Sequence, residues 1–211
     1  MNFENALGAE FRELTERNHN GKPARVVAAT RVYPTTQEDL WDAITNKERL
    51  PRWFSPVTGN LEPEGRYKIK GNAKGKIIKC DPPDSFELTW EIFFNVSWVH
   101  VRLAPESNGT RLTLEHIMLK GGLAERHWRR YGPGATGVGW DLAFLDLGLH
   151  LDMGGAEIDR STHDVWMKSD AGKTFLRTCA AAWGRSHIAA GETEENAHTN
   201  AAATAKFYAG D

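Results

Sequence analysis

Residues 85–119 have the sequence SFELTWEIFFNVSWVHVRLAPESNGTRLTLEHIML, and this stretch contains the pattern that decides the fold. Three apolar runs, Ser85–Phe94, Ser97–Ala104 and Thr110–Leu119, are separated by two residues and by the turn-forming segment Pro105–Gly109. Within each run apolar and polar side chains alternate, which is typical of half-buried antiparallel strands. Turns this short make the strands neighbours. The sequence therefore predicts a meander with one buried face and one face in water.

The alternation also predicts which side chains of the meander point inward. This inward set is almost wholly apolar, and His116 is its one titratable member. A buried imidazole can orient a ligand or act as a general base, and it can equally be a core histidine hydrogen-bonded to a neighbour. The predicted inward residues are Phe86, Leu88, Trp90, Ile92, Val99, Val101, Leu103, Leu112, Leu114, His116 and Met118.

Several further elements are predicted before the meander. Apolar residues at helical spacing predict a short N-terminal helix that ends near Asn20-Gly21. The residues at this spacing are Phe3, Leu7, Phe11 and Leu14. Between this helix and the meander, the sequence predicts a strand at Ala24–Tyr33, helices beginning near Thr35-Thr36 and Thr45, and strands at Gly65–Gly71 and Lys74–Cys80.

A long helix is predicted at about residues 136–151, and it is apolar on two nearly opposite sides. We expect one stripe, which includes Trp140 and Phe144, to face the sheet, so the other stripe needs a further layer. Helices predicted at about residues 170–190 and 192–208 can supply it, either within one chain or across the two-fold axis of a homodimer. The second stripe consists of Val138, Leu142, Leu145 and Leu149.

Composition and charge exclude several classes of protein. The 211 residues carry a formal net charge of −2, whereas a general nucleic-acid binder has a strongly basic face. No apolar run is long enough to span a bilayer, and residues 1–5 lack the basic and apolar regions of a secretory signal. Cys80 and Cys179 lie far apart in the sequence and are expected to be reduced thiols. We therefore expect a cytoplasmic protein with no nucleic-acid partner and no membrane insertion.

Motifs for metal, nucleotide and nucleophilic chemistry are weak. The histidines show neither HxxxH nor HExxH spacing and no GxSxG is present, so we expect no metal site and no cofactor. Gly132–Gly137 matches G-x-G-x-x-G, but a dinucleotide site also needs a βαβ unit, which antiparallel strands do not form. The segment Arg126–Tyr131 mixes cations with aromatic residues. We expect it to be a solvated loop with one anchoring tryptophan, and a cavity lid or an anion-binding segment are the alternatives.

Five short stretches resemble, in the same order, the START-like superfamily and within it the homologues of the heat-shock protein 90 ATPase activator, which also carry polyketide-cyclase-type labels. The stretches are Asp39–Thr45, Arg49–Pro56, Gly65–Tyr67, Asp81–Pro83 and Thr110–His116. The resemblance covers about residues 24–151. It implies an α+β helix-grip fold, in which a curved antiparallel sheet wraps a long C-terminal helix around a deep apolar cavity.

The resemblance also implies how the chain is divided. Residues 1–23 are then an N-terminal helical segment, residues 24–151 the START-like domain, and residues 152–211 a helical extension packed on the core. The extension resembles those seen in bacterial members of the family.

Members of the superfamily bind lipids, sterols, polyketides or plant hormones in this cavity, and a few perform cyclisation or dehydration. The resemblance and the inward pattern together imply a small hydrophobic ligand between sheet and helix, and we expect binding rather than catalysis. The alternatives are a cyclase or dehydratase that uses His116 and a chaperone-cofactor-like interaction module. The expected pocket residues are Trp53, Phe54, Trp90, His116, Met118, Trp140 and Phe144.

Overall fold

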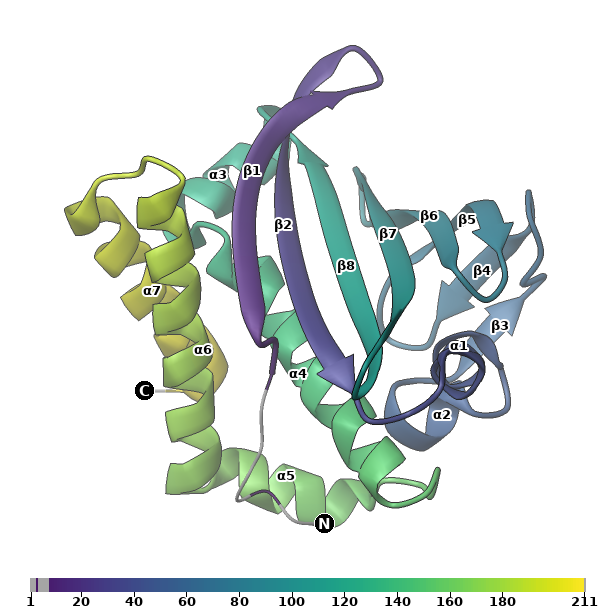
Figure 1. Cartoon of the computed structure of the whole chain (residues 1–211). Coiled ribbons are helices and arrows are strands. Elements are labelled where there is room, and N and C mark those ends of the chain that lie inside the picture. Colours follow the sequence, from purple (N-terminus) through teal and green to yellow (C-terminus); the bar gives the residue numbers. More distant parts are fainter. Residues whose placement is uncertain (1–2, 4–7, 211) are drawn as a thin grey trace.

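The computed structural model describes Phe3 and residues 8–210, with the backbone alone for Leu123. In this part of the chain, helix α4 lies against one face of a single large sheet (Figure 1). Helix α6 packs against α4 and β1, and helices α5 and α7 pack against α6. The strands are β1 (Phe11–His19), β2 (Lys22–Tyr33), β3 (Val57–Gly59), β4 (Arg66–Ile69), β5 (Lys74–Asp81), β6 (Ser85–Ile92), β7 (Asn95–Glu106) and β8 (Gly109–Leu119). The helices are α1 (Gln37–Thr45), α2 (Leu50–Trp53), α3 (Gly122–Tyr131), α4 (Gly134–Asp152), α5 (Arg160–Lys168), α6 (Asp170–Ala189) and α7 (Glu194–Ala209).

The sheet has the order β1-β2-β8-β7-β6-β5-β4-β3, and all neighbouring strands are antiparallel. The predicted meander is confirmed as β6, β7 and β8, but its second face is not wholly in water, because Ile117 packs there with Ala24 and Val26 of β2. Phe86 lies opposite Val101, and Val101 lies opposite Leu114. All three belong to the predicted inward set, and Val101 and Leu114 are buried. The strands predicted from residues 24, 65 and 74 are confirmed as β2, β4 and β5.

The predicted N-terminal helix is wrong for residues 11–19, which form strand β1. This strand pairs with β2 along its whole length. Asn20 (φ 51°) and Gly21 (φ 75°) close the hairpin in left-handed backbone, a turn for which Asn-Gly is the favoured sequence.

The physical reason for this difference is the edge of β2. An unpaired strand edge exposes a row of backbone donors and acceptors, and β1 satisfies them. This gain outweighs the helical spacing of Phe11 and Leu14. Leu7, the remaining apolar residue of the predicted helix after Phe3, lies outside the described residues, as do residues 1–2 and 4–6.

Residues 126–131 are also different from their prediction, because they are helical and not a solvated loop. The first turn of α3 contains Glu125, whose carboxylate accepts the backbone N–H of Gly121 at 3.0 Å. This bond satisfies one of the donors that the start of a helix leaves unpaired. The half-buried Trp128 lies under the guanidinium of Arg25, 4.4 Å from the ring centroid, so the tryptophan fixes the helix against β2.

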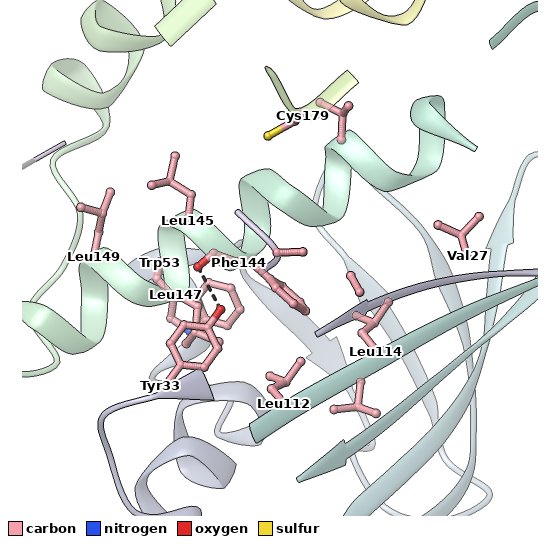
Figure 2. Close-up of a cluster of buried hydrophobic side chains, with 14 of the residues drawn as sticks. Val27, Tyr33, Trp53, Leu112, Leu114, Phe144, Leu145, Leu147, Leu149 and Cys179 are labelled. Atoms are coloured by element: carbon pink, nitrogen blue, oxygen red, sulfur yellow. Dashed lines mark hydrogen bonds between the residues drawn. The ribbon is translucent and has the colours of Figure 1, made fainter. Parts of the chain in front are cut away.

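Helix α4 is buried on two sides, as its two apolar stripes predict. Figure 2 shows Phe144 and Leu147 on the side that faces β8, and Leu145 on the opposite side, toward Cys179 of α6. Gly137 of α4 lies so close to the indole of Trp183 that a Cβ there would be 2.1 Å from the ring. Helix α6 of the same chain therefore supplies the layer that the second stripe needs.

The contact between α4, β1 and α6 centres on the carboxylate of Asp141, which is fully buried. It accepts hydrogen bonds from the guanidinium of Arg12 (2.7 Å), the backbone N–H of Ala9 (2.7 Å) and the indole N–H of Trp183 (2.8 Å). A buried charge is tolerated only where it is paired and hydrogen-bonded. The carboxylate thus fixes the relative position of four segments, namely α4, the residues before β1, β1 itself and α6.

Replacing Asp141 by Asn should lower the free energy of unfolding by about 3–5 kcal/mol, because Arg12 then loses its charge partner in a largely buried position. The measurement is urea unfolding followed by circular dichroism. Asp152→Asn, at the exposed end of the same helix, should change stability by less than about 1 kcal/mol. Equal effects of the two substitutions would show that the buried ion pair does not hold β1 and α6 to α4.

Candidate functional site

An apolar cavity lies between the sheet and α4, and we call it the inner cavity. Its volume is about 170 Å³. Strands β4 to β8 line one side, α4 lines the other, and α1, α2 and the segment after α2 close one end. Among its lining residues are Trp53, Phe54, Leu88, Trp90, Leu112, Leu114, Trp140, Phe144 and Leu147.

The main chain around the inner cavity is held by side chains whose polar ends are satisfied. The indole N–H of Trp53 donates to the carbonyl of Ala43 at 2.9 Å, which joins α2 to α1. The hydroxyl of Tyr33 donates to the carbonyl of Phe144 at 2.9 Å (Figure 2), which joins β2 to α4. With its N–H satisfied, Trp53 contributes the apolar part of its ring to the lining of the cavity.

A second and larger hollow of about 600 Å³, the outer cleft, borders the inner cavity. It is more polar, since Arg25, Ser97, His116 and Thr136 contribute to its lining. Four residues line both spaces, namely Phe54, Trp90, Trp140 and Ala143. These four residues lie between the inner cavity and the outer cleft. Because three of them are aromatic, we call the four the aromatic wall.

The predicted pocket residues are thus brought to two adjoining spaces and not to one. Five of the seven line the inner cavity, and three of those five also belong to the aromatic wall. His116 and Met118 line the outer cleft alone. The difference follows from their position near the end of β8, where the strand passes beyond the edge of the inner cavity.

The aromatic wall is held by a chain of hydrogen bonds through His116, which is 6% exposed. The indole N–H of Trp140 meets Nδ1 of His116 at 3.1 Å, and an indole can only donate, so Nδ1 accepts. Nε2 of the neutral ring therefore carries the proton and donates to Oγ of Ser97 at 2.8 Å. Ser97 in turn donates to the carbonyl of Trp90 at 3.0 Å.

Burial keeps the His116 ring neutral, and the hydrogen-bond chain decides which nitrogen carries the proton. Burial lowers the pKa of the imidazole to about 4, because the charged form loses its hydration. The neutral ring uses its lone pair for Trp140 and its proton for Ser97. Its role in this geometry is to position Trp140 against Trp90, whose ring centroids are 5.1 Å apart in an edge-on arrangement.

Arg25 of β2 also lines the outer cleft, and it forms an ion pair with Glu125 of α3. The two terminal guanidinium nitrogens of Arg25 donate to the carboxylate, at 2.8 and 3.0 Å. Hydrogen bonds from Arg25 and from the backbone of Gly121 lower the pKa of Glu125 to about 2. The pair holds α3 beside β2.

Two polar residues of the site were missed by sequence reasoning. Ser97 has the same inward phase as Val99 on β7, so the alternation itself contained the signal. Tyr67 lines the inner cavity and donates its hydroxyl to the carbonyl of Thr89 at 2.6 Å. In the residues that the structure describes, no group of three or more His, Cys, Asp or Glu side chains is placed to hold a metal ion.

A comparison with protein families gives the class of this chain. The family model described as "Activator of Hsp90 ATPase homolog 1-like protein" matches residues 34–151, which is more than half of the chain. The chain belongs to this family. No curated protein matches the sequence.

Solved structures show the same fold. The crystal structure of CalU16 from Micromonospora echinospora is 26% identical, covers 82% of this chain and 97% of its own, and has a TM-score of 0.62. The solution structure of CalU16 is 25% identical, covers 87% and 97%, and has a TM-score of 0.68. Protein MLL2253 from Mesorhizobium loti, 22% identical over 61% of this chain and 98% of its own, has a TM-score of 0.53 and is similar in fold.

These likenesses identify the fold as the helix-grip, START-like fold that the sequence motifs imply. The CalU16 structures also cover more of this chain than residues 34–151. The similarity to CalU16 therefore extends past the part that the family model matches.

The burial of His116 makes the stability of the protein depend on pH. Above pH 6.5 the ring is neutral in both the folded and the unfolded chain. Below pH 6.5 the imidazole is protonated in the unfolded chain, whereas in the folded chain it stays neutral down to about pH 4. The free energy of unfolding therefore falls as the pH is lowered from 6.5 to 4, by about 3 kcal/mol in total.

His116→Gln should remove this part of the acid destabilisation, because an amide can accept from Trp140 and donate to Ser97 without titrating. Urea unfolding at pH 7 and pH 4.5 measures the difference. His198→Gln on the exposed side of α7 is the matched control and should keep the wild-type pH dependence. If His116→Gln keeps the wild-type loss of stability between pH 7 and pH 4.5, the lowered pKa of the buried ring is contradicted.

Proposed function

We propose that this protein binds a small hydrophobic molecule between its sheet and α4. The observation that carries the proposal is the inner cavity, a space of about 170 Å³ with an almost wholly apolar lining of aromatic and aliphatic side chains. Ligand sites in proteins are typically concave and mostly apolar, with a few placed polar groups. The membership of the Hsp90-activator homologue family and the likeness to CalU16 support a cavity-containing fold.

The size of the inner cavity sets what can enter it. A dry apolar cavity of about 150 Å³ holds a molecule of the size of benzene. The inner cavity therefore accommodates one ring or one short branched chain, and the rest of a larger ligand extends into the outer cleft. We propose an amphipathic arrangement, in which the apolar end lies inside the aromatic wall and the more polar end lies near Ser97 and Arg25.

Binding is better supported than catalysis by the geometry at His116. A general base needs a free lone pair directed at its substrate, and Nδ1 of His116 accepts from Trp140. A histidine that acts as a general acid must be protonated near neutral pH. Burial lowers the pKa of the His116 ring to about 4, so the ring is neutral at that pH. His116 therefore acts as a positioning residue for the wall, and the ligand contacts the indoles that it holds.

Filling the inner cavity should abolish binding, and adjacent residues of β5 offer a matched pair for this test. Ile77 lines the cavity, whereas Ile78 faces outward and is 39% exposed. The probe N-phenyl-1-naphthylamine, a neutral apolar fluorophore, should bind the wild-type protein with enhanced emission. Ile77→Trp should weaken its binding about tenfold or more, because an oversized side chain and the ring then compete for one space.

Ile78→Trp is the control and should bind the probe like the wild type. Both variants must first show wild-type circular dichroism. If the wild-type protein binds no probe and no apolar molecule co-purifies with it by mass spectrometry, the proposed function is wrong. Equal binding by the two variants would place the binding site elsewhere on the protein.

The aromatic wall should limit the length of the apolar end of the ligand. Trp90→Ala removes one of the two indoles of the wall and widens the passage from the inner cavity to the outer cleft. The affinities of straight-chain alcohols of increasing length are measured by competition with the naphthylamine probe. For the wild type, affinity should stop rising at a certain chain length. For Trp90→Ala, affinity should continue to rise beyond that length, by about fourfold for each added methylene. Trp98→Ala, which alters the opposite face of β7, should leave the wild-type length limit unchanged.

A further inference from the structure

Two phenylalanines at the turn between β6 and β7 are unusually exposed. Phe93 and Phe94 each have 95% of their surface open to solvent, and their neighbours Ile92 and Val96 are 39% and 44% exposed. Phe93 also has a φ of 52°, a conformation that bulky residues rarely adopt. Tight hairpin turns favour Asn and Gly, so turn formation gives no reason for an aromatic pair here.

The strand register places this turn at one particular end of the sheet. Glu91 of β6 lies opposite Lys74, so the β4–β5 turn is beside the β6–β7 turn. Ile117 near the end of β8 lies opposite Trp98 and also opposite Val26, so the end of β8 and the β1–β2 turn are at the same end. Helix α3 follows β8 directly and lies at this end as well (Figure 1).

This end of the molecule is basic, although the whole chain has a net charge of −2. Several acidic residues there have basic partners, because Glu16 pairs with Lys120, Glu125 pairs with Arg25 and Glu91 faces Arg66 at 4.0 Å. The α6–α7 turn beside α3 adds Glu192, which lies 3.6 Å from His187, and the exposed Glu194 and Glu195. Exposed cations at this end are Lys22, Lys70, Lys74, Arg126, Arg129 and Arg130.

The outer cleft adjoins the same end. Its lining includes Phe93 and Phe94 from the β6–β7 turn, Asn72 from the β4–β5 turn and Trp128 from α3. The aromatic tip and the basic residues around it therefore border the entrance through which a molecule would reach the aromatic wall.

We propose that this end of the protein docks on an anionic membrane surface, with Phe93 and Phe94 inserted among the lipids and the surrounding cations against the headgroups. Peripheral proteins bind such surfaces by combining a few inserted apolar residues with nearby basic ones. The docking is interfacial: among the described residues no helix is long and apolar enough to cross a membrane.

The shape of the patch favours a membrane over a protein partner. A stable protein interface buries about 800 Å² on each side, whereas two phenylalanines supply about 150–250 Å² each. The pair lies at a turn that borders the outer cleft, and most of its surface is open to solvent. A lipid surface needs no complementary shape, and it accommodates a narrow apolar tip between basic residues.

The experiment is co-sedimentation of the full chain with vesicles of phosphatidylcholine that contain about 30% phosphatidylserine. The wild type should bind these vesicles, and Phe93→Ser combined with Phe94→Ser should bind about tenfold or more weakly. Lys70→Glu combined with Lys74→Glu should also weaken binding, and about 0.5 M salt should do the same to the wild type.

The matched control is Phe11→Ser, a phenylalanine that is 59% exposed at the opposite end of β1, and it should bind vesicles like the wild type. Circular dichroism and urea midpoints establish that every variant is folded. Absence of vesicle binding by the wild type would overturn the proposal, as would equal binding by the double serine variant. A third outcome is that the wild type binds no vesicles but self-associates in sedimentation velocity, and that the double serine variant does not self-associate. This outcome would assign Phe93 and Phe94 to contact with a second copy of this chain. This result does not depend on whether the inner cavity binds its probe, so it is separate from a failure of the proposed function.

Discussion

The buried carboxylate of Asp141 is the interaction on which the arrangement of this protein depends. It lies in the first half of α4 and binds groups from the N-terminal segment, from β1 and from α6. An uncompensated charge in this place would be costly, so the fold needs both the carboxylate and the groups that bind it. Elements far apart in the sequence are thereby held against α4.

A fixed α4 then determines the cavity on its other side. Phe144 and Leu147 face β8 across the inner cavity, and Trp140 projects where the cavity meets the outer cleft. The hydrogen-bond chain from Trp140 through His116 and Ser97 to the main chain of Trp90 joins α4 to three strands. The aromatic wall, in which this neutral histidine positions Trp140, thus separates an apolar space of about 170 Å³ from a more polar one of about 600 Å³.

Much of the fold could be predicted, because alternation and helical periodicity report burial residue by residue. The inward face of the meander and the two stripes of α4 follow from local spacing alone. The N-terminal segment shows where this reasoning stops. Phe11 and Leu14 have the spacing of a helix, and only the unpaired edge of β2, formed by residues elsewhere in the chain, turns the segment into a strand.

The candidate site divides in the same way. The sequence by itself determined that Trp90, His116 and Met118 share a face and that Trp140 and Phe144 share a stripe, because side-chain direction is a property of the strand and the helix. Only the tertiary structure decided that His116 binds Trp140 and Ser97 and that the aromatic wall divides the space in two. The physical reason is that a hydrogen bond or a cavity depends on the distance between elements, and this distance is set by the packing of α4 against the sheet and by the contacts of Asp141.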